Sequence, residues 1–192
     1  MVEFGKHGPE RSPVTGCVAP ASGIPSSFLR DPRISSSEKH HMKLVHLLQM
    51  KVAVEGPIEI GPMPIGTRRV FNATGGYFEG EGLKGEVLPG GGEWFLDAGE
   101  GFGQVDVRLM LRTDDGAHIY LRYSGIMDFN EVVGGKLAAG QSTEYGDNTF
   151  LTQVRMECAD PKYAWLSTSV AVGEGRMHPD CVEYAIYEIA HG

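Results

Sequence analysis

Hydrophobic and polar residues alternate along most of the chain after Met42, which is the pattern of half-buried β-strands. The clearest example is QVDVRLMLR (104–112), in which every second residue is apolar. The Asp115-Gly116 pair that follows is typical of a hairpin turn. Beyond it HIYLRYSGIM (118–127) continues as the expected antiparallel partner. These two strands indicate an all-β domain built from consecutive hairpins.

The same pattern predicts about ten short strands and, at 130–140, one short helix. The expected strands are 44–55, 68–73, 76–80, 83–88, 93–98, 104–112, 118–127, 150–158, 165–175 and 181–189. Up-and-down order and heavy turn content favour a barrel over a sandwich. We therefore predict a closed antiparallel β-barrel of about 8–10 strands with one short helix.

Glycines are densest between Thr74 and Trp94, in TGGYFEGEGLKGEVLPGGGEW. They interleave with strand-forming residues, which is typical of short, strongly bent hairpins at the corners of a barrel. A closed barrel matters for function because its interior is a natural small-molecule cavity.

The first 41 residues differ from the rest. They hold five of the 11 prolines and a run of three serines, with no periodic apolar pattern. We predict an irregular N-terminal extension at 1–41 and a single barrel domain at 42–192. The extension is either an appendage to a domain that starts near Met42 or a tail that wraps the barrel or a partner.

Composition argues against some classes of partner and indicates the cellular compartment. The net charge of −8 argues against nucleic acid and against an anionic membrane surface. No apolar run approaches the ~20 residues of a membrane span. Three cysteines do not make a disulfide framework, and the N-terminus has no apolar signal core. We expect a cytoplasmic protein with no membrane partner.

The strands at 104–112 and 118–127 each carry a polar row on one face. Asp106 and Arg108 share a face of the first strand, and His118, Tyr120 and Arg122 share a face of the second. Alternation alone does not say which face is buried. The polar row either faces solvent or lines a polar lumen.

The candidate catalytic residues are taken from this row: Asp106, Arg108, Tyr120 and Arg122. Neighbouring strands place same-face side chains about 5 Å apart. Arg108 and Arg122 are suited to hold an enolate or carboxylate oxygen. Tyr120 can donate to a developing oxyanion, and Asp106 can orient its neighbours or act as a base. The alternative is a structural ion-pair network.

Aromatic residues near this row are candidates for the walls of a ligand pocket. The candidate ligand-binding residues are Trp94, Phe78, His118, Tyr145, Phe150 and Trp165. Apolar walls with a few convergent polar groups define a small-molecule site. The alternative for the aromatic residues is the hydrophobic core.

No motif for a cofactor or a metal is recognisable. The histidines are scattered without H-x-H or H-E-x-x-H spacing, and there is no phosphate loop or dinucleotide fingerprint. We therefore expect neither a metal nor a cofactor.

Four stretches resemble a family of unknown function, domain of unknown function 3237, also called the UPF0311 proteins. They are TGGYFEGEGLKGEVLPGGGEW (74–94), DVRLMLRTDDGAHIYLRYSGI (106–126), YAWLSTSVAVGEGR (163–176) and VEYAIYEI (182–189). The resemblance spans about 42–189. It implies a small calycin-like barrel that self-associates, with members near genes for aromatic or polyketide metabolism.

The resemblance also carries individual positions. Asp106 and Arg108 stand at the family's D-x-R pair, and Tyr120 and Arg122 at its I-Y-x-R stretch. The chain departs from the family pattern at four positions: Glu93, Tyr123, Leu151 and Ser167. Leu151 stands where an arginine is usual, which suggests a less anionic ligand.

Together these observations predict a barrel that binds a small hydrophobic or aromatic molecule. One hypothesis is a cofactor-free isomerase, cyclase or lyase acting on an aromatic or polyketide-like metabolite. The alternatives are a non-catalytic carrier or dirigent-like protein, and a structural, oligomerising β protein. The position of the Asp106/Arg108 face separates the structural alternative from the other two, since both site hypotheses need that face inside the barrel, and turnover separates the enzyme from the carrier.

Overall fold

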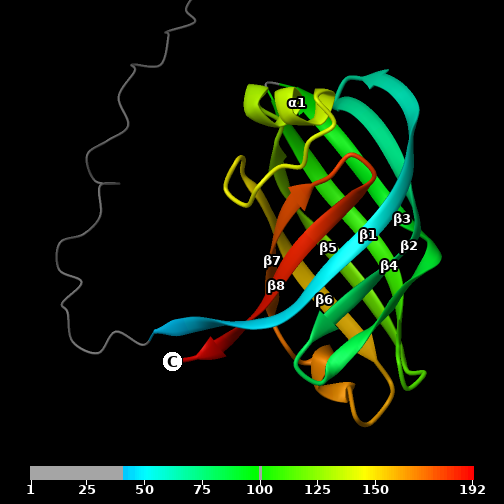
Figure 1. The fold of residues 1–192 in the computed structure, drawn as a ribbon, viewed down its shortest axis with the longest axis vertical. Helices are drawn as coiled ribbons and strands as arrows, with labels where there is room; N and C mark the ends of the chain where they lie inside the picture. The colour runs from blue at the N-terminus through cyan, green and yellow to red at the C-terminus, as the bar shows by residue number, and fades with distance from the viewer. Residues whose placement is uncertain (1–40, 100) are drawn as a thin grey trace, which may run out of the picture. The chain divides into compact units, whose positions relative to one another are not determined.

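The computed structural model describes residues 41–99 and 101–192, and these form one antiparallel β-barrel (Figure 1). Its elements are β1 (Met42–Met63), β2 (Gly66–Gly80), β3 (Leu83–Gly99), β4 (Phe102–Thr113), β5 (His118–Asp128), α1 (Glu131–Ala138), β6 (Phe150–Cys158), the 3₁₀ helix η2 (Ala164–Ser167), β7 (Ala171–Met177) and β8 (Cys181–His191). The predicted extension at 1–41 falls, apart from His41, outside the described residues and stays a prediction.

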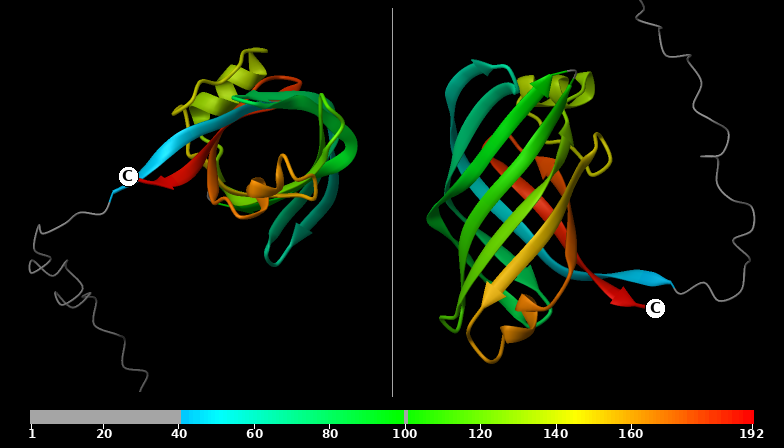
Figure 2. Two further views of the ribbon diagram at one scale, coloured as in Figure 1. Left: turned by 90° about the horizontal axis from the view of Figure 1, so that it is seen from below. Right: turned by 180° about the vertical axis from the view of Figure 1, so that it is seen from behind.

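Eight strands pair in chain order, and β8 pairs with β1 to close the ring. Figure 2 shows the ring from its lower end, with the outer ends of β1 and β8 splayed away from it. The predicted fold class, a closed antiparallel barrel with one short helix, is confirmed. Self-association is not tested by a single chain and stays a prediction.

The barrel has fewer strands than the ten segments expected, because glycines bend strands here without ending them. The expected segments 68–73 and 76–80 are one strand, β2, and 83–88 and 93–98 are one strand, β3. The ladder between β2 and β3 shifts register between Asn72 and Gly76, as a bulge does. Glycine-rich bends thus lie within the long strands.

Close approach of neighbouring strands explains why glycine is needed there. A Cβ added to Gly76 would lie 2.0 Å from the carbonyl oxygen of Lys51, and one at Gly85 would lie 2.1 Å from that of Arg112. Any side chain would force these strands apart.

The inner face of the barrel is the apolar face of each alternating strand. Val105, Val107, Leu109 and Leu111 of β4 are buried, whereas the residues between them are exposed or half-buried. The lower half of the interior, toward the β4–β5 turn, is filled by tightly buried side chains; we call it the packed half. It includes Leu48, Phe78, Leu83, Leu109, Leu111 and Leu121.

Helix α1 lies at the opposite, upper end of the barrel (Figure 1). The Asn130 side chain accepts a hydrogen bond from the Val133 amide and so caps the helix at its start. Val133 is fully buried. The short helix predicted at 130–140 is confirmed.

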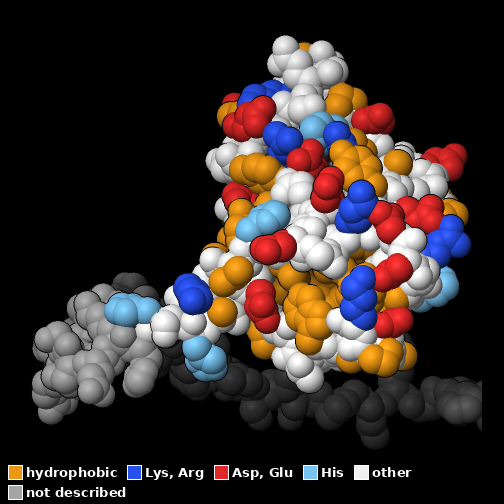
Figure 3. Space-filling model, turned by 60° about the horizontal axis from the view of Figure 1, so that its bottom comes forward, with side chains coloured by type: hydrophobic (Ala, Val, Ile, Leu, Met, Phe, Trp, Pro, Cys, Tyr) orange, Lys and Arg blue, Asp and Glu red, His pale blue; other side chains and the backbone are white. Residues whose placement is uncertain are grey.

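The outer surface carries charges of both signs. On the face shown in Figure 3, acidic and basic side chains are interspersed with hydrophobic ones. Among the described residues, none of the helices is long and apolar enough to cross a membrane.

Candidate functional site

A cavity of about 530 Å³ opens at the helix end of the barrel interior, and we call it the mouth cavity. Its walls are largely apolar, as in most small-molecule sites, and its volume falls within their usual range of about 300–1,000 Å³. Five phenylalanines line it: Phe71, Phe95, Phe102, Phe129 and Phe150. Leu137 of α1 contributes from above.

Glu93 brings a carboxyl group into this apolar wall. Alternation along β3 turns Glu93, Phe95 and Asp97 toward the same side, and all three line the mouth cavity. Loss of water around the carboxyl is the main cause that raises the pKa of Glu93 from 4.5 to about 7, and the Asp106 carboxylate on the neighbouring strand adds to it. Glu93 therefore exchanges a proton near neutral pH.

Two tyrosines lie directly beneath Glu93. Tyr123 and Tyr184 border a small void that shares Glu93, Val54 and Val182 with the mouth cavity. Their ring centroids are 4.9 Å apart. Burial, followed by nearby negative charge, raises the pKa of each tyrosine well above its ordinary value. Both hydroxyls therefore stay protonated beside the Glu93 carboxyl.

Arg69 supplies a guanidinium at the rim, but that group is already paired. Its Nε donates to Glu59 Oε1 and its Nη1 to Asp97 Oδ2, each at 2.9 Å. Asp97 also accepts a hydrogen bond from the amide of Gly99 at 3.1 Å. The bond from Arg69 is the main cause that lowers the pKa of Asp97. Arg69 and Asp97 thus form a fixed ion pair on the wall.

His178 joins the opposite rim to the loop that follows α1. Its Nδ1 lies 2.7 Å from Ser142 Oγ in the loop, and its Nε2 lies 2.9 Å from Glu183 Oε2 on β8. Arg176 pairs with the same carboxylate at 3.0 Å. Burial raises the pKa of Glu183, but hydrogen bonds from Gln49, His178 and Arg176 outweigh it, and the net shift is downward. Both ring nitrogens of His178 are therefore engaged.

The residues predicted to be catalytic do not lie in this cavity. Asp106, Arg108, Tyr120 and Arg122 are on the outer face of β4 and β5, since the alternate residues of both strands fill the interior. Arg108 pairs with Asp106 at 3.3 Å, with both side chains about half exposed. The hypothesis that this row lines a polar lumen is wrong, because a closed barrel encloses its apolar face.

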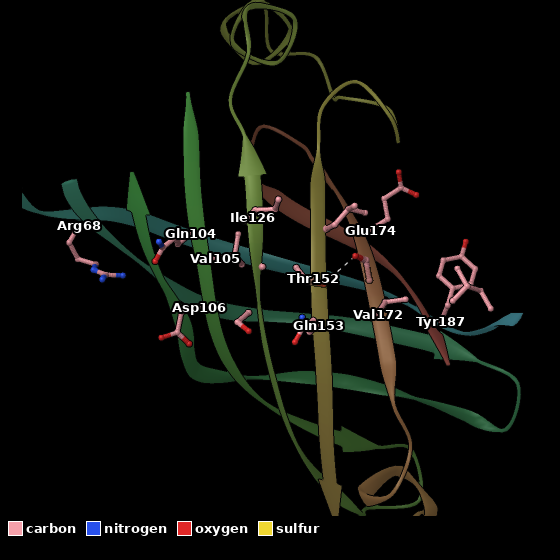
Figure 4. Close-up of a pocket in the computed structure, with 15 residues that line it drawn as sticks. Arg68, Gln104, Val105, Asp106, Ile126, Thr152, Gln153, Val172, Glu174 and Tyr187 are labelled. Carbon is pink, nitrogen blue, oxygen red and sulfur yellow. Dashed lines mark hydrogen bonds between the residues drawn. The ribbon is translucent and has the colours of Figure 1, made fainter. Parts of the chain in front are cut away.

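Asp106 instead borders an open hollow on the outer surface, shown in Figure 4. In that view Gln104, Asp106, Ile126 and Gln153 project from neighbouring strands, with Arg68 and Tyr187 at the two sides. The hollow has about 1,070 Å³ but is wide and open to solvent. It therefore lacks the enclosure that desolvates a reacting group.

Of the residues predicted to bind a ligand, Phe150 lines the mouth cavity. Phe78 is part of the packed half. Trp94 is 38% exposed on the outside, where the guanidinium of Arg108 lies 5.4 Å from its ring, and Trp165 is 41% exposed in η2.

The two other predicted ligand-binding residues also lie outside the mouth cavity. His118 begins β5 on the exposed face. Tyr145 lies in the loop after α1, where its ring stacks 5.0 Å from the guanidinium of Arg176. Of the six predicted ligand-binding residues, Phe150 is thus the one that lines the mouth cavity.

Sequence analysis did not select Glu93, Arg69 or Tyr123 as site residues, and it considered Tyr184 only as one of several aromatic residues that could line a pocket. The signal for Glu93 was present in the alternation of Glu93, Phe95 and Asp97, which puts carboxyl groups and an aromatic ring on one face of a strand. Glu93 and Tyr123 also stand at positions where the chain departs from its family's pattern. No group of three or more His, Cys, Asp or Glu side chains suited to a metal ion occurs among residues 41–99 and 101–192.

Comparison with known proteins places this fold in a family. The model of the family described as "Protein of unknown function (DUF3237)" matches residues 42–189. A UPF0311 protein from Rhodopseudomonas palustris is 30% identical over 129 residues, 67% of this chain and 84% of its own. PR-toxin biosynthesis cluster protein 7 from Penicillium roqueforti is 29% identical over 154 residues, 70% of this chain and 83% of its own.

Solved structures share the barrel. A β-barrel-like protein from Acinetobacter baumannii superposes with a TM-score of 0.68 at 32% identity, covering 80% of this chain and 99% of that one. A protein from Penicillium herquei, described as an enzyme, superposes with a TM-score of 0.59 at 19% identity, covering 81% and 99%. The second likeness is one of fold alone.

Proposed function

The chain belongs to the DUF3237 family, and we propose that its barrel is a cofactor-independent enzyme that moves a proton on a small carbonyl compound held in the mouth cavity. The observation that carries this proposal is Glu93, a carboxyl group with a pKa of about 7 in an aromatic wall. A general base is most effective when its pKa lies near the working pH. A half-buried carboxyl group that loses most of its hydration costs the fold stability, and a catalytic role would explain why one lies here.

The proposed step begins with ionised Glu93 and a substrate carbonyl group. The carboxylate removes a proton from the carbon next to the carbonyl, and the C–H electron pair moves to the carbonyl oxygen to give an enolate. In a β,γ-unsaturated substrate, return of the same proton to the γ-carbon completes an isomerisation. In a β-hydroxy substrate, loss of hydroxide from the β-carbon, with that proton, completes a dehydration to water. Neither outcome requires an oxidant or a reductant.

Tyr123 and Tyr184 support Glu93 in this step. Their hydroxyls remain protonated and are hydrogen-bonded to each other, and the charge of ionised Glu93 is felt at both. They lie one layer deeper than the cavity and act as positioning residues.

The walls and the relatives support an aromatic or polyketide-like metabolite. Phenylalanine rings surround the cavity on several strands. One relative is named for a toxin biosynthesis cluster, and this name supports a role in secondary metabolism.

Hydrogen–deuterium exchange of 2-tetralone tests the proposal, because this bicyclic ketone loses an α-proton readily and exchange needs no knowledge of the natural product. In D₂O followed by NMR, the wild-type chain should accelerate exchange, with a rate that rises with pH through about 7. Glu93→Gln should reduce the acceleration by about 10²–10⁴-fold. Glu93→Asp should retain part of the acceleration, since the carboxylate base is kept but its shorter side chain places it farther from the ketone.

Arg108→Ala and Tyr120→Phe on the outer face are the matched controls, and both should exchange the ketone as fast as wild type. If Glu93→Gln binds the ketone and exchanges it at the wild-type rate, catalysis by Glu93 is excluded. If the wild type binds the ketone without accelerating exchange, the barrel is a carrier.

A further inference from the structure

The phenylalanines at the mouth form an entrance as well as a wall. Phe102 and Phe129 are 53% and 48% exposed, whereas Phe95 and Phe150 are buried deeper in the same cavity. Phe102 opens β4 and Phe129 follows β5, so both rings stand at the upper end of the barrel. Exposed and buried rings along one path favour a flat ligand that stacks on them as it enters.

The ionisable groups of the same wall do not suit a negatively charged ligand. Glu93 and Asp97 contribute carboxyl groups, and Asp97 is kept ionised by Arg69. Above pH 7 Glu93 is mostly ionised as well. A carboxylate ligand would therefore meet two like charges, Asp97 at the exposed rim and Glu93 deeper in the wall, where loss of water strengthens the interaction between charges.

The cationic groups of the wall already pair with other side chains, so they attract such a ligand only weakly. Arg69 is the one arginine among the described residues that line the cavity, and its Nε and Nη1 donate to two carboxylates. These bonds are the main causes that raise its pKa. His178 has both ring nitrogens engaged by Ser142 and Glu183. An incoming carboxylate would have to displace Asp97 from Arg69 to gain a bidentate partner.

We infer that the mouth cavity selects uncharged, flat carbonyl compounds and rejects carboxylates of the same shape, with the Arg69–Asp97 pair and Glu93 as the residues that set this specificity. This inference rests on the proposed function, since it concerns the ligand of the same cavity. It states that the substrate is uncharged, whereas the proposed proton transfer alone is compatible with charged and uncharged carbonyl compounds.

A matched pair of probes tests the inference on the full chain at pH 8. 2-Tetralone and tetrahydronaphthalene-2-carboxylate share a ring system and differ in the charge at one position. Isothermal titration should give a dissociation constant roughly tenfold or more larger for the carboxylate. Asp97→Asn frees part of the Arg69 guanidinium, and Glu93→Gln removes a negative charge, so each variant should bring the two dissociation constants closer.

Glu86→Gln is the matched control for the loss of one negative charge. Glu86 pairs with Arg112 on the outer face, and both side chains are about half exposed. This variant should keep the wild-type ratio. Since Asp97 takes part in rim structure, Glu93→Gln provides the same test should Asp97→Asn fail to fold.

The outcomes separate this inference from the proposed function. If the carboxylate binds the wild type as tightly as the ketone, the inference is overturned while the cavity remains a ligand site. If the ketone is preferred but Glu93→Gln still exchanges its α-protons at the wild-type rate, catalysis by Glu93 fails and the selectivity stands. If neither probe binds, both proposals fall.

Discussion

The two halves of the barrel interior are built from the same eight strands but differ in chemistry. The packed half holds leucines and a phenylalanine that are almost completely buried. The mouth cavity holds a carboxyl group with a raised pKa, an arginine paired with two carboxylates, and partly exposed aromatic rings. A strand such as β3 passes through both, from Leu83 at one end to Glu93 at the other.

The ends of the two halves are also closed differently. At the lower end, Asp115 in the β4–β5 turn accepts hydrogen bonds from Thr113, Lys162 and Tyr163 at 2.6–3.1 Å. The bond from Lys162 is the main cause that lowers the pKa of Asp115 to about 2. At the upper end, one short helix and a loop cover the cavity. The lower end is thus closed by a hydrogen-bonded turn, while the upper end holds the open mouth cavity.

This difference shows how a small barrel separates stability from function. Burial of large apolar side chains stabilises the fold, whereas a buried carboxyl group and exposed aromatic rings cost stability. Because these features lie at opposite ends of the barrel, the packed half can supply stability while the mouth cavity supplies the chemical groups of the site. Three substitutions test this separation, and their effects should decrease in the order given.

The largest effect is expected from shortening a leucine in the packed half. Leu121→Ala should lower the free energy of unfolding by about 2–5 kcal/mol, because Leu121 is completely buried and leaves a cavity. Leu137→Ala, which shortens the same side chain at the half-buried mouth, should cost about 1 kcal/mol. Urea denaturation measures both. Equal losses would contradict the division of the interior into two halves.

An intermediate effect is expected for Glu93→Gln, and it should depend on pH. Because the folded-state pKa of about 7 exceeds the ordinary 4.5, ionisation of Glu93 costs the folded state stability as pH rises through this range. The glutamine variant lacks this loss. It should match the wild type below pH 4.5 and exceed it by roughly 1–3 kcal/mol above pH 7. Thermal unfolding at pH 4 and pH 8 measures the difference, and a gain that is the same at both pH values would refute the raised pKa.

The smallest effect is expected on the outer face. Arg122 lies directly opposite Arg108 on one neighbouring strand and Arg155 on the other. Like charges in this position repel, so Arg122→Gln should raise the free energy of unfolding by about 0.2–1 kcal/mol at low salt. Arg112→Gln is the control, and it should lower the free energy of unfolding, since Arg112 pairs with Glu86. A loss of stability at Arg122 would show that this face depends on its charge.

Most strands could be predicted from the sequence because alternation is a local property, but the strand expected at 165–175 is wrong in its first part, which contains residues of the 3₁₀ helix η2, and β7 begins only at Ala171. Residues 104–112 and 118–127 fall within β4 and β5 as expected. The number of strands was harder to predict, since a glycine ends some strands and bends others. Whether Gly76 ends its strand or bends it depends on how closely its backbone approaches Lys51, which lies 25 positions earlier in the chain.

The site could not be predicted in the same way, because alternation does not tell which face of a strand turns inward. The polar row that contains Asp106 was predicted to be catalytic because of its charged side chains, but in the closed barrel it lies on the outer face. The alternation of β3 placed Glu93 beside Phe95, but its apolar surroundings became clear only once Phe71, its partner on β2, and Phe150 of β6 were known to line the same cavity. A perturbed pKa is a property of such surroundings, and the local sequence does not contain it.

The construction of α1 has a consequence for the permanence of the cavity wall. The helix is eight residues long, and Val133 is its one buried side chain. Helices this short are marginal on their own. We expect α1 to detach far more often than any strand leaves the barrel, so the part of the cavity wall that Leu137 supplies is present only while the helix is docked.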